Sequence, residues 1–326
     1  MTGRTTHRLE GLEPDNLLAF MALLGLLRIL EETRPDWRPR VFWTFDELPL
    51  RPALRVPETA DEAAIVGAAS EGLRSLSARH DFDGLRDLTL PPQETARRLG
   101  QVAAEANEAP YTADLWSALV SDAAISHDRK KAEPTPLCLM FGQGHQHFLA
   151  RLASIPREAT PPHRGVGGRK VEISEGECLR EALFAPWTRP DATQSFRWDP
   201  NEDVRYALRA RDPTDAKTKE TTQHGANRLA AIGISVLTVV PRQRAGEVKL
   251  AIVGGVREAD GRFAVEWPMW REPISLACIR ALLSHPHLDR SETRAAFGIV
   301  ERRRARRISS GKFMNFTRAN MVSEQD

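Results

Sequence analysis

The apolar residues of this chain are most concentrated in residues 17–30, LLAFMALLGLLRIL. They would occupy nearly every face of a helix, and a helix of that kind must be covered on all sides. Asp15 stands at the expected N-cap position. The run has 14 residues and includes Arg28, whereas a membrane span needs about 20 apolar residues. The pattern therefore predicts a buried helix at the centre of the N-terminal part.

Helical spacing of apolar residues dominates the rest of the first half. In 113–125, for example, Leu115, Trp116 and Leu119 fall on one side of a helix. Short runs of β-forming residues without that spacing indicate strands. The expected helices are 60–79, 92–107, 113–125 and 148–155, and the expected strands are 40–47 and 137–141.

The second half changes character after a Pro- and Gly-rich segment at 157–170. Ser174 and Glu177 have the spacing of a capping box for a helix that ends at Leu183. Later segments alternate and favour an antiparallel meander. The expected strands are 236–240, 247–256 and 262–266, with one or two more in 299–316, and the expected helices are 225–232 and 275–284. We expect an α+β fold with a mainly helical part, residues 1–160, followed by a sheet-containing part, residues 161–326.

Composition changes this picture little. Apolar residues make up 41% and charged residues 28% of the chain, an ordinary globular balance. The net charge of +2 is too small to indicate a polyanion partner, so positive charge has to be judged where it is clustered. The three cysteines are far apart and form no CxxC pair. Without a signal-peptide pattern, they favour a reducing, cytoplasmic location.

The strongest local feature is the basic segment 302–318, RRRARRISSGKFMNFTR, which contains no acidic residue. Clustered positive charge displaces counterions from a phosphate backbone, and interleaved aromatic rings can stack on bases. The alternative is a solvated basic edge that discourages strand-to-strand aggregation. We expect this segment to position nucleic acid through Arg302, Arg303, Arg304, Arg306, Arg307 and Lys312, with Asn315 as a candidate base contact.

Two further segments are candidates for contact with bases. In GVGGRK, residues 165–170, glycines allow close approach to a phosphate, and Arg169 and Lys170 add charge, although a mobile surface loop explains the composition equally well. In HGANRL, residues 224–229, Asn227 and Arg228 could read adenine and guanine. Capping and packing of a helix is the alternative for that segment.

No catalytic motif is present, so we expect a protein that is not an enzyme and has no cofactor. His145 and His147 alternate as two metal ligands on a strand could. A third ligand is not evident nearby, and catalytic zinc usually has three protein ligands. No metal site is therefore predicted.

Four blocks of the chain are distinctive: LLAFMALLGLLRIL, DPTDAKTKETTQHGANRLAAIGI, VEWPMWREPISLACIRALLSHPHL and RISSGKFMNFTRA. They occur in order along nearly the whole chain and together cover less than a third of it. GANRLA, WPMW-x-x-PISL and GKFMNFT are the more specific pieces. Together these blocks resemble the compact large-subunit-like proteins of type I-G (formerly I-U) CRISPR Cascade complexes.

The resemblance implies a non-catalytic subunit of a crRNA-guided surveillance complex. Its partners would be the other Cascade subunits, crRNA, double-stranded target DNA and a helicase–nuclease recruited in trans, with no membrane partner. Such subunits read the protospacer-adjacent motif and stabilise the opened duplex. Two alternatives remain: a crRNA-binding or processing subunit of the same complex, and an unrelated metal-dependent hydrolase that uses His145 and His147.

Overall fold

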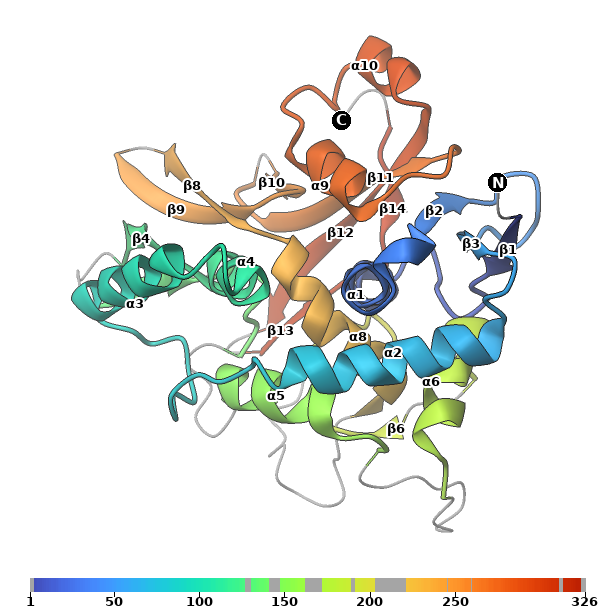
Figure 1. Cartoon of the computed structure of the whole chain (residues 1–326). Helices are drawn as coiled ribbons and strands as arrows, with labels where there is room; N and C mark the ends of the chain where they lie inside the picture. Colours follow the sequence, from blue (N-terminus) through green and yellow to red (C-terminus); the bar gives the residue numbers. More distant parts are fainter. Residues whose placement is uncertain are drawn as a thin grey trace.

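A computed structural model of the chain combines helices with antiparallel sheets (Figure 1). It describes residues 3–126, 130–140, 147–161, 172–188, 191–202, 221–244, 246–258, 260–310 and 313–323. The predicted α+β class is confirmed. None of the helices in these ranges combines the length and apolar character that crossing a bilayer requires.

Helix α1, Leu17–Thr33, is the buried central helix that the sequence predicts (Figure 1). Every residue from Leu17 to Leu27 is buried, because α8, His224–Gly233, and α2, Glu62–Ser77, pack against it. The N-cap is Asn16, which accepts a hydrogen bond from Ala19 N, so the prediction of Asp15 is wrong by one residue.

The N-terminal sheet is antiparallel and has the strand order β1–β3–β2. Its strands are β1 Arg4–Arg8, β2 Arg40–Trp43 and β3 Pro52–Pro57. Val41, Leu54 and Val56 are buried on the inner face. Side chains alternate between the faces of a strand, so Arg40 and Arg55, which are cross-strand partners, both lie on the outer face.

The C-terminal sheet is built around β11, Phe263–Trp270, which is buried at every position. On its inner face Trp267 stacks on Phe20 of α1, with ring centroids 5.0 Å apart. Helix α9, Leu276–Ser284, packs against β11 and α1, and Ser275 caps it as predicted. The other strands of this sheet are β10 Gly255–Arg257, β12 Ile299–Ser310, β13 Phe313–Phe316 and β14 Asn320–Met321.

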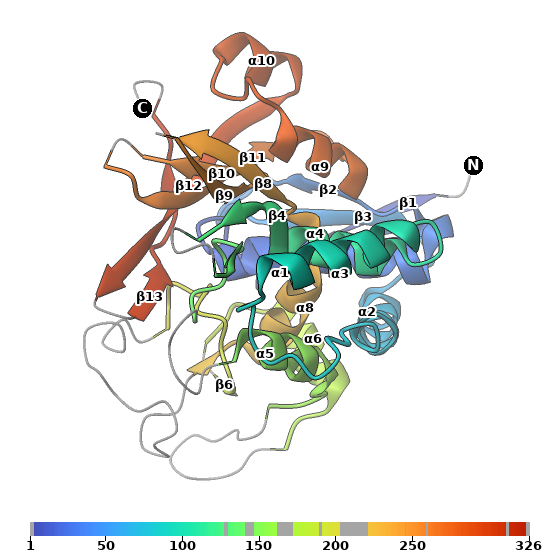
Figure 2. The same cartoon turned by 90° about the vertical axis from the view of Figure 1, so that its left-hand side faces the viewer.

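The remaining elements surround these two sheets, and Figure 2 shows β4, β8 and β9 beside α3 and α4. Within the described ranges, three two-stranded ribbons pair β4 with β5, β6 with β7 and β8 with β9. The strands are β4 Val120–Ile125, β5 Ala132–Pro134, β6 Asp191–Ala192, β7 Thr221–Thr222, β8 Val239–Arg244 and β9 Glu247–Ile252. The helices are η1 Pro35–Trp37, α3 Pro92–Ala104, α4 Pro110–Leu119, α5 Phe148–Ser154, η2 Ile155–Arg157, α6 Glu175–Phe184, η4 Ile234–Val236 and α10 Ser291–Ala296.

Several predicted elements need correction. The strand expected at 236–240 begins only at Val239, because η4 ends at Val236, and the strand expected at 247–256 is divided into β9 and β10. The helix expected at 113–125 ends at Leu119, and Val120–Ile125 continues as β4, because it pairs with β5. Residues 137–140 form turns instead of the start of a strand. The capping box of Ser174 and Glu177 is confirmed. Buried residues from both sides of residue 160 belong to one core, so the two expected parts share their interior.

Candidate functional site

The arginines of the C-terminal basic segment are ion-paired along β12. Arg302 Nη1 lies 2.6 Å from Glu266 Oε1, and Arg304 Nε lies 3.0 Å from Glu266 Oε2. Arg306 Nε lies 2.6 Å from Glu258 Oε1. Glu266 stands opposite Arg304 in the neighbouring strand, where opposite charges attract directly. The sequence segment has no acid, but the folded strand meets acids from β11 and from the turn before it.

The other residues of this segment are also engaged or lie outside the described ranges. Arg303 Nε lies 2.6 Å from Glu301 Oε1. Arg307 lies over the Phe263 ring at 5.3 Å, and burial lowers the pKa of its guanidinium, with Arg257 adding to the effect. Asn315 is buried. Lys312 lies outside the described residues. Nucleic-acid contact by this segment stays a prediction, but most of its charge is compensated internally.

Asn227 and Arg228 are interior residues of α8, which corrects the expectation that they form a base-reading surface. Arg228 is 1% exposed. Its guanidinium donates to Pro156 O and Ala159 O and lies 2.6 Å from Glu175 Oε1. The Asn227 side chain donates to Gln194 O. The alternative of capping and packing therefore describes this segment. Arg169 and Lys170 lie outside the described residues.

His147 forms a pair with a carboxylate but belongs to no metal cluster in the described part of the chain. Its Nδ1 lies 2.7 Å from Asp87 Oδ2. Among the described residues, no group of three or more potential ligands could hold a metal ion. His145 lies outside those residues. The pair alone supplies too few ligands for a zinc site.

A different group of arginines lies on the outer face of the N-terminal sheet, and we call it the arginine surface. It consists of Arg4 on β1, Arg38 after η1, Arg40 on β2 and Arg55 on β3. Arg40 and Arg55 are cross-strand partners, and Arg55 pairs with Thr6, two residues from Arg4. Side chains two apart on a strand share a face. The sheet register therefore gathers arginines that are more than 50 positions apart in sequence.

Arg4 is the fixed centre of the arginine surface. Its guanidinium donates to the carbonyl oxygens of Trp37, Arg38 and Arg55 at 2.8, 2.8 and 3.2 Å. Burial lowers the pKa of Arg4, and the charges of Arg55, Arg40 and Arg38 lower it further. The carbonyls satisfy its hydrogen bonds without neutralising its charge, so the positive field around it persists.

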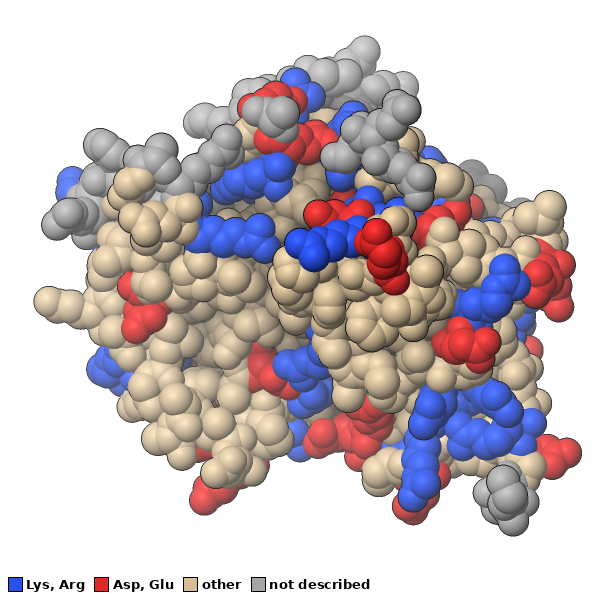
Figure 3. Space-filling view, turned by 90° about the horizontal axis from the view of Figure 1, so that it is seen from above, with Lys and Arg blue, Asp and Glu red and all other residues tan. Residues whose placement is uncertain are grey.

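The arginine surface differs from β12 in having no acidic partners within the described ranges. None of its four arginines forms an ion pair there, and Arg38, Arg40 and Arg55 are exposed. Figure 3 shows Lys and Arg side chains gathered at the lower right of the upper face, over the N-terminal strands. Unpaired like charges at close range repel one another unless an anion lies between them.

Sequence reasoning missed this surface because no window of the chain contains it. The available signal was Arg38 and Arg40 in RPR, at the start of the strand expected at 40–47. Alternation predicts that two such residues share a face. Which residues lie beside them depends on the register with β3 and β1.

The structure also contains a polar pocket of about 260 Å³. Its lining includes Glu13, Asp199, Arg318, Asn201, Gln223 and Trp187, together with two threonines. These residues come from the loop before α1, the segment after α6, the β6–β7 region, the N-cap of α8 and the segment after β13. Residues from two of the sequence blocks that carry the family resemblance, Gln223 and Arg318, therefore meet here.

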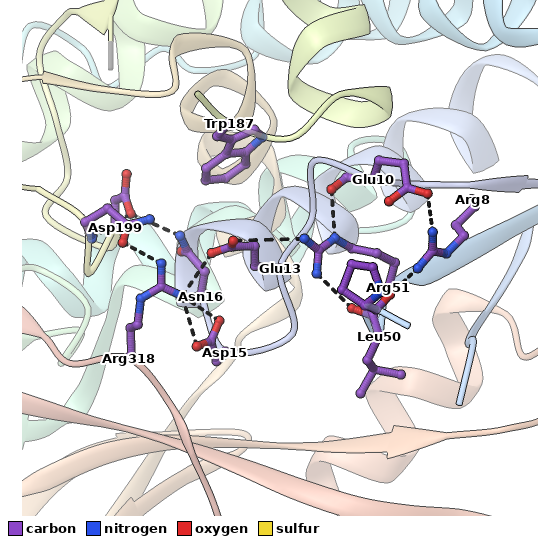
Figure 4. Close-up of polar contacts among 12 residues, drawn as sticks. Arg8, Glu10, Glu13, Asp15, Asn16, Leu50, Arg51, Trp187, Asp199 and Arg318 are labelled. Atoms are coloured by element: carbon purple, nitrogen blue, oxygen red, sulfur yellow. Dashed lines mark hydrogen bonds and ion pairs between the residues drawn. The ribbon is translucent and has the colours of Figure 1, made fainter. Parts of the chain in front are cut away.

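Arg318 organises the acidic side of the pocket (Figure 4). Its Nη1 donates to Glu13 and Asp15 at 2.9 Å, and its Nη2 donates to Asn201 Oδ1 at 2.7 Å. Glu13 Oε1 in turn lies 4.0 Å from Arg51 Nη2, next to β3. A chain of polar contacts thus connects the pocket to the N-terminal sheet.

Asp199 is the buried carboxylate of the pocket, with an exposed fraction of 4%. It accepts hydrogen bonds from Asn16 Nδ2, Asn201 N and Thr222 Oγ1 at 3.0, 2.9 and 2.9 Å. Burial raises the pKa of this carboxyl, although the hydrogen bonds and Arg318 act in the opposite direction. These contacts tie the start of α1 to β7 and hold the pocket wall in place.

Comparison with protein-family models found no family that matches the chain. Comparison with curated proteins found no match either.

Proposed function

We propose that this chain is a DNA-binding subunit of a crRNA-guided surveillance complex of the type I CRISPR class, and that the arginine surface holds the phosphate backbone. The resemblance of the four sequence blocks supports the class of complex. The observation that carries DNA binding is the absence of any ion pair to Arg4, Arg38, Arg40 or Arg55 in the described part of the chain.

The geometry of the arginine surface suits a phosphate chain. Adjacent strands of a sheet are roughly 5 Å apart, so arginines on three neighbouring strands extend over about 10 Å. Each guanidinium can form a bidentate pair with a phosphate. Two or three successive phosphates could therefore contact Arg40 and Arg55 on the strands and Arg38 beside them, while Arg4 on β1 remains hydrogen-bonded to the backbone.

The test is a salt series of DNA-binding measurements on the assembled complex. The variant carries Arg38→Ala, Arg40→Ala and Arg55→Ala, and it spares Arg4 because that residue joins the strands. Loss of three phosphate contacts should weaken binding to all duplexes alike and reduce the slope of log affinity against log salt by about 2.7.

A matched control removes the same charge from ion-paired positions. It carries Arg97→Ala, Arg262→Ala and Arg271→Ala, whose partners are Glu94, Asp260 and Asp46. The control should leave the slope close to that of the unaltered protein. Equal slopes for both variants and the unaltered protein would refute backbone binding at the arginine surface. A slope change on guide RNA alone, with none on duplex DNA, would favour a crRNA-binding subunit instead.

A further inference from the structure

The pocket beside Arg318 is lined by a side-chain amide donor that has no protein partner among the described residues. Gln223 is 6% exposed, and its Oε1 accepts from Ala226 N as the cap of α8. That contact identifies the oxygen of the amide, because a backbone N–H needs an acceptor. The remaining Nε2 group lines the pocket and forms no hydrogen bond within the described ranges. Because this group faces the pocket, an acceptor on a ligand could replace the water that would otherwise pair with it.

Other groups of the pocket supply both donors and acceptors. Asn201 uses its Oδ1 for Arg318, which leaves its Nδ2 as a second donor. Asp199 accepts three hydrogen bonds, whereas a carboxylate has about four acceptor sites. Glu13 is one-third exposed and adds further acceptor capacity. A complementary ligand must therefore both accept and donate.

Trp187 provides a flat apolar wall. Its Nε1 donates to Ala182 O at 3.0 Å, so the polar edge of the indole is already satisfied. The ring lies on one side of the pocket, while Arg318 and Asp15 lie on the other (Figure 4). Planar heteroaromatic groups stack on such a ring.

The combination of charges and hydrogen-bonding groups excludes simpler ligands. A phosphate only accepts hydrogen bonds and would be repelled by Glu13, Asp15 and Asp199, which outnumber Arg318. A guanidinium or ammonium group only donates, so it would leave the Gln223 donor unpaired. A nucleobase has ring or carbonyl acceptors beside N–H donors on one planar edge. The volume of about 260 Å³ suits a ligand smaller than a typical drug.

We propose that this pocket holds one unstacked nucleobase, which stacks on Trp187 while its edge pairs with Gln223, Asn201 and the carboxylates. This inference rests on the proposed function, since nucleic acid would bring the base. Bases with an exocyclic amino group fit best because the carboxylates need donors. The arginine surface would hold the backbone, and the acidic pocket would exclude phosphate and admit only the base.

The first experiment titrates the full chain with adenosine, guanosine, cytidine and thymidine, using calorimetry. Nucleosides carry no phosphate, so their binding does not depend on the arginine surface. Arginine amide and inorganic phosphate serve as the cationic and anionic probes. We expect the three amino-bearing nucleosides to bind more tightly than thymidine, and neither ionic probe to bind at the pocket.

Two variants locate the binding. Trp187→Leu removes the ring and should weaken nucleoside binding roughly tenfold to a hundredfold, whereas Trp187→Phe retains a stacking ring and should bind almost normally. Gln223→Glu keeps an oxygen for the α8 cap but replaces the donor with an acceptor, and it should weaken binding strongly. Thermal unfolding of each variant identifies any that fails to fold.

The source of the base is tested with single-stranded DNA that carries 5-iododeoxycytidine. Irradiation should cross-link it to Trp187, as mapped by mass spectrometry. Binding of arginine amide instead of nucleosides, or of no probe, would overturn the proposal. Nucleoside binding without the cross-link would overturn the inference that the base in the pocket comes from a nucleic acid. If the triple arginine variant still binds nucleosides normally, a failure of DNA binding belongs to the arginine surface and not to the pocket.

Discussion

The crossing of α1 and α8 depends on two glycines and makes a sharp stability prediction. A Cβ at Gly25 would lie 1.9 Å from Leu229 O, and a Cβ at Gly233 would lie 2.0 Å from Met21 O. Both obstacles are backbone atoms of the facing helix, so no side-chain rotation can relieve them. Both helices begin beside the pocket, at Asn16 and Gln223. Their close approach therefore sets the spacing of the pocket walls.

The expected cost of Gly25→Ala follows from this geometry. Non-bonded heavy atoms pack at separations of roughly 3.5–4.0 Å. A Cβ at 1.9 Å from Leu229 O is far too close, so the two helices must move apart by more than about 1 Å. Overpacking costs about 1–3 kcal/mol, and the upper end, about 3 kcal/mol, applies here because the obstacle is a backbone atom. The higher helix propensity of Ala returns about 1 kcal/mol. We expect a net loss of about 2 kcal/mol in the free energy of unfolding.

Gly67→Ala is the matched control. Gly67 lies within α2, is exposed, and has no atom within 4 Å of the position of its Cβ. The same chemical change should therefore stabilise the protein by about 0.5–1 kcal/mol. Urea unfolding followed by circular dichroism measures both variants, and the midpoints should move in opposite directions. A Gly25→Ala midpoint equal to or above that of the unaltered protein would refute the close crossing of α1 and α8.

Two further predictions concern buried ionisable residues. Arg228→Met should lower the free energy of unfolding by about 3 kcal/mol, because it deprives Pro156 O, Ala159 O and Glu175 of a donor. Unchanged stability together with an altered DNA sequence preference would contradict this prediction. Burial lowers the pKa of His80 and of His224 from 6.5 to about 4. Between these two pH values the unfolded chain binds more protons than the folded protein does. The free energy of unfolding therefore falls as the pH falls, by up to roughly 3 kcal/mol per histidine. Urea midpoints at pH 7.5 and 5 test this, and His80→Gln should make the decrease smaller; equal midpoints for the unaltered protein would contradict it.

The sequence alone identifies the elements whose structure depends on local pattern. Apolar residues on every face of 17–30 predict that α1 is buried, because no orientation could expose only polar groups. The capping box at Ser174 and the cap at Ser275 are also local, since each side chain bonds a backbone N–H three residues away. Where a partner strand decides the structure, the same reasoning fails. Val120–Ile125 continues a helical pattern but becomes β4 through its pairing with β5.

Charge shows the limit of sequence reasoning more clearly than secondary structure does. Five arginines in six residues of β12 dominate the sequence, yet Glu258, Glu266 and Glu301 compensate most of them in the fold. The arginine surface is dispersed in the sequence and uncompensated in the described structure. Coulomb interactions depend on distance in space, and the sheet register sets that distance.

The pocket is likewise a product of tertiary structure. Sequence established the residue types, and the resemblance marked the segments that contain Gln223 and Arg318. Only the fold decided that Arg228 lies inside while Gln223, five residues earlier on the same segment, lines the pocket. Burial of a polar side chain depends on which distant carbonyls and carboxylates meet it, and several segments far apart in the chain supply them here. Local pattern therefore determined the helices and strands, whereas long-range packing determined which polar groups remain available for a ligand.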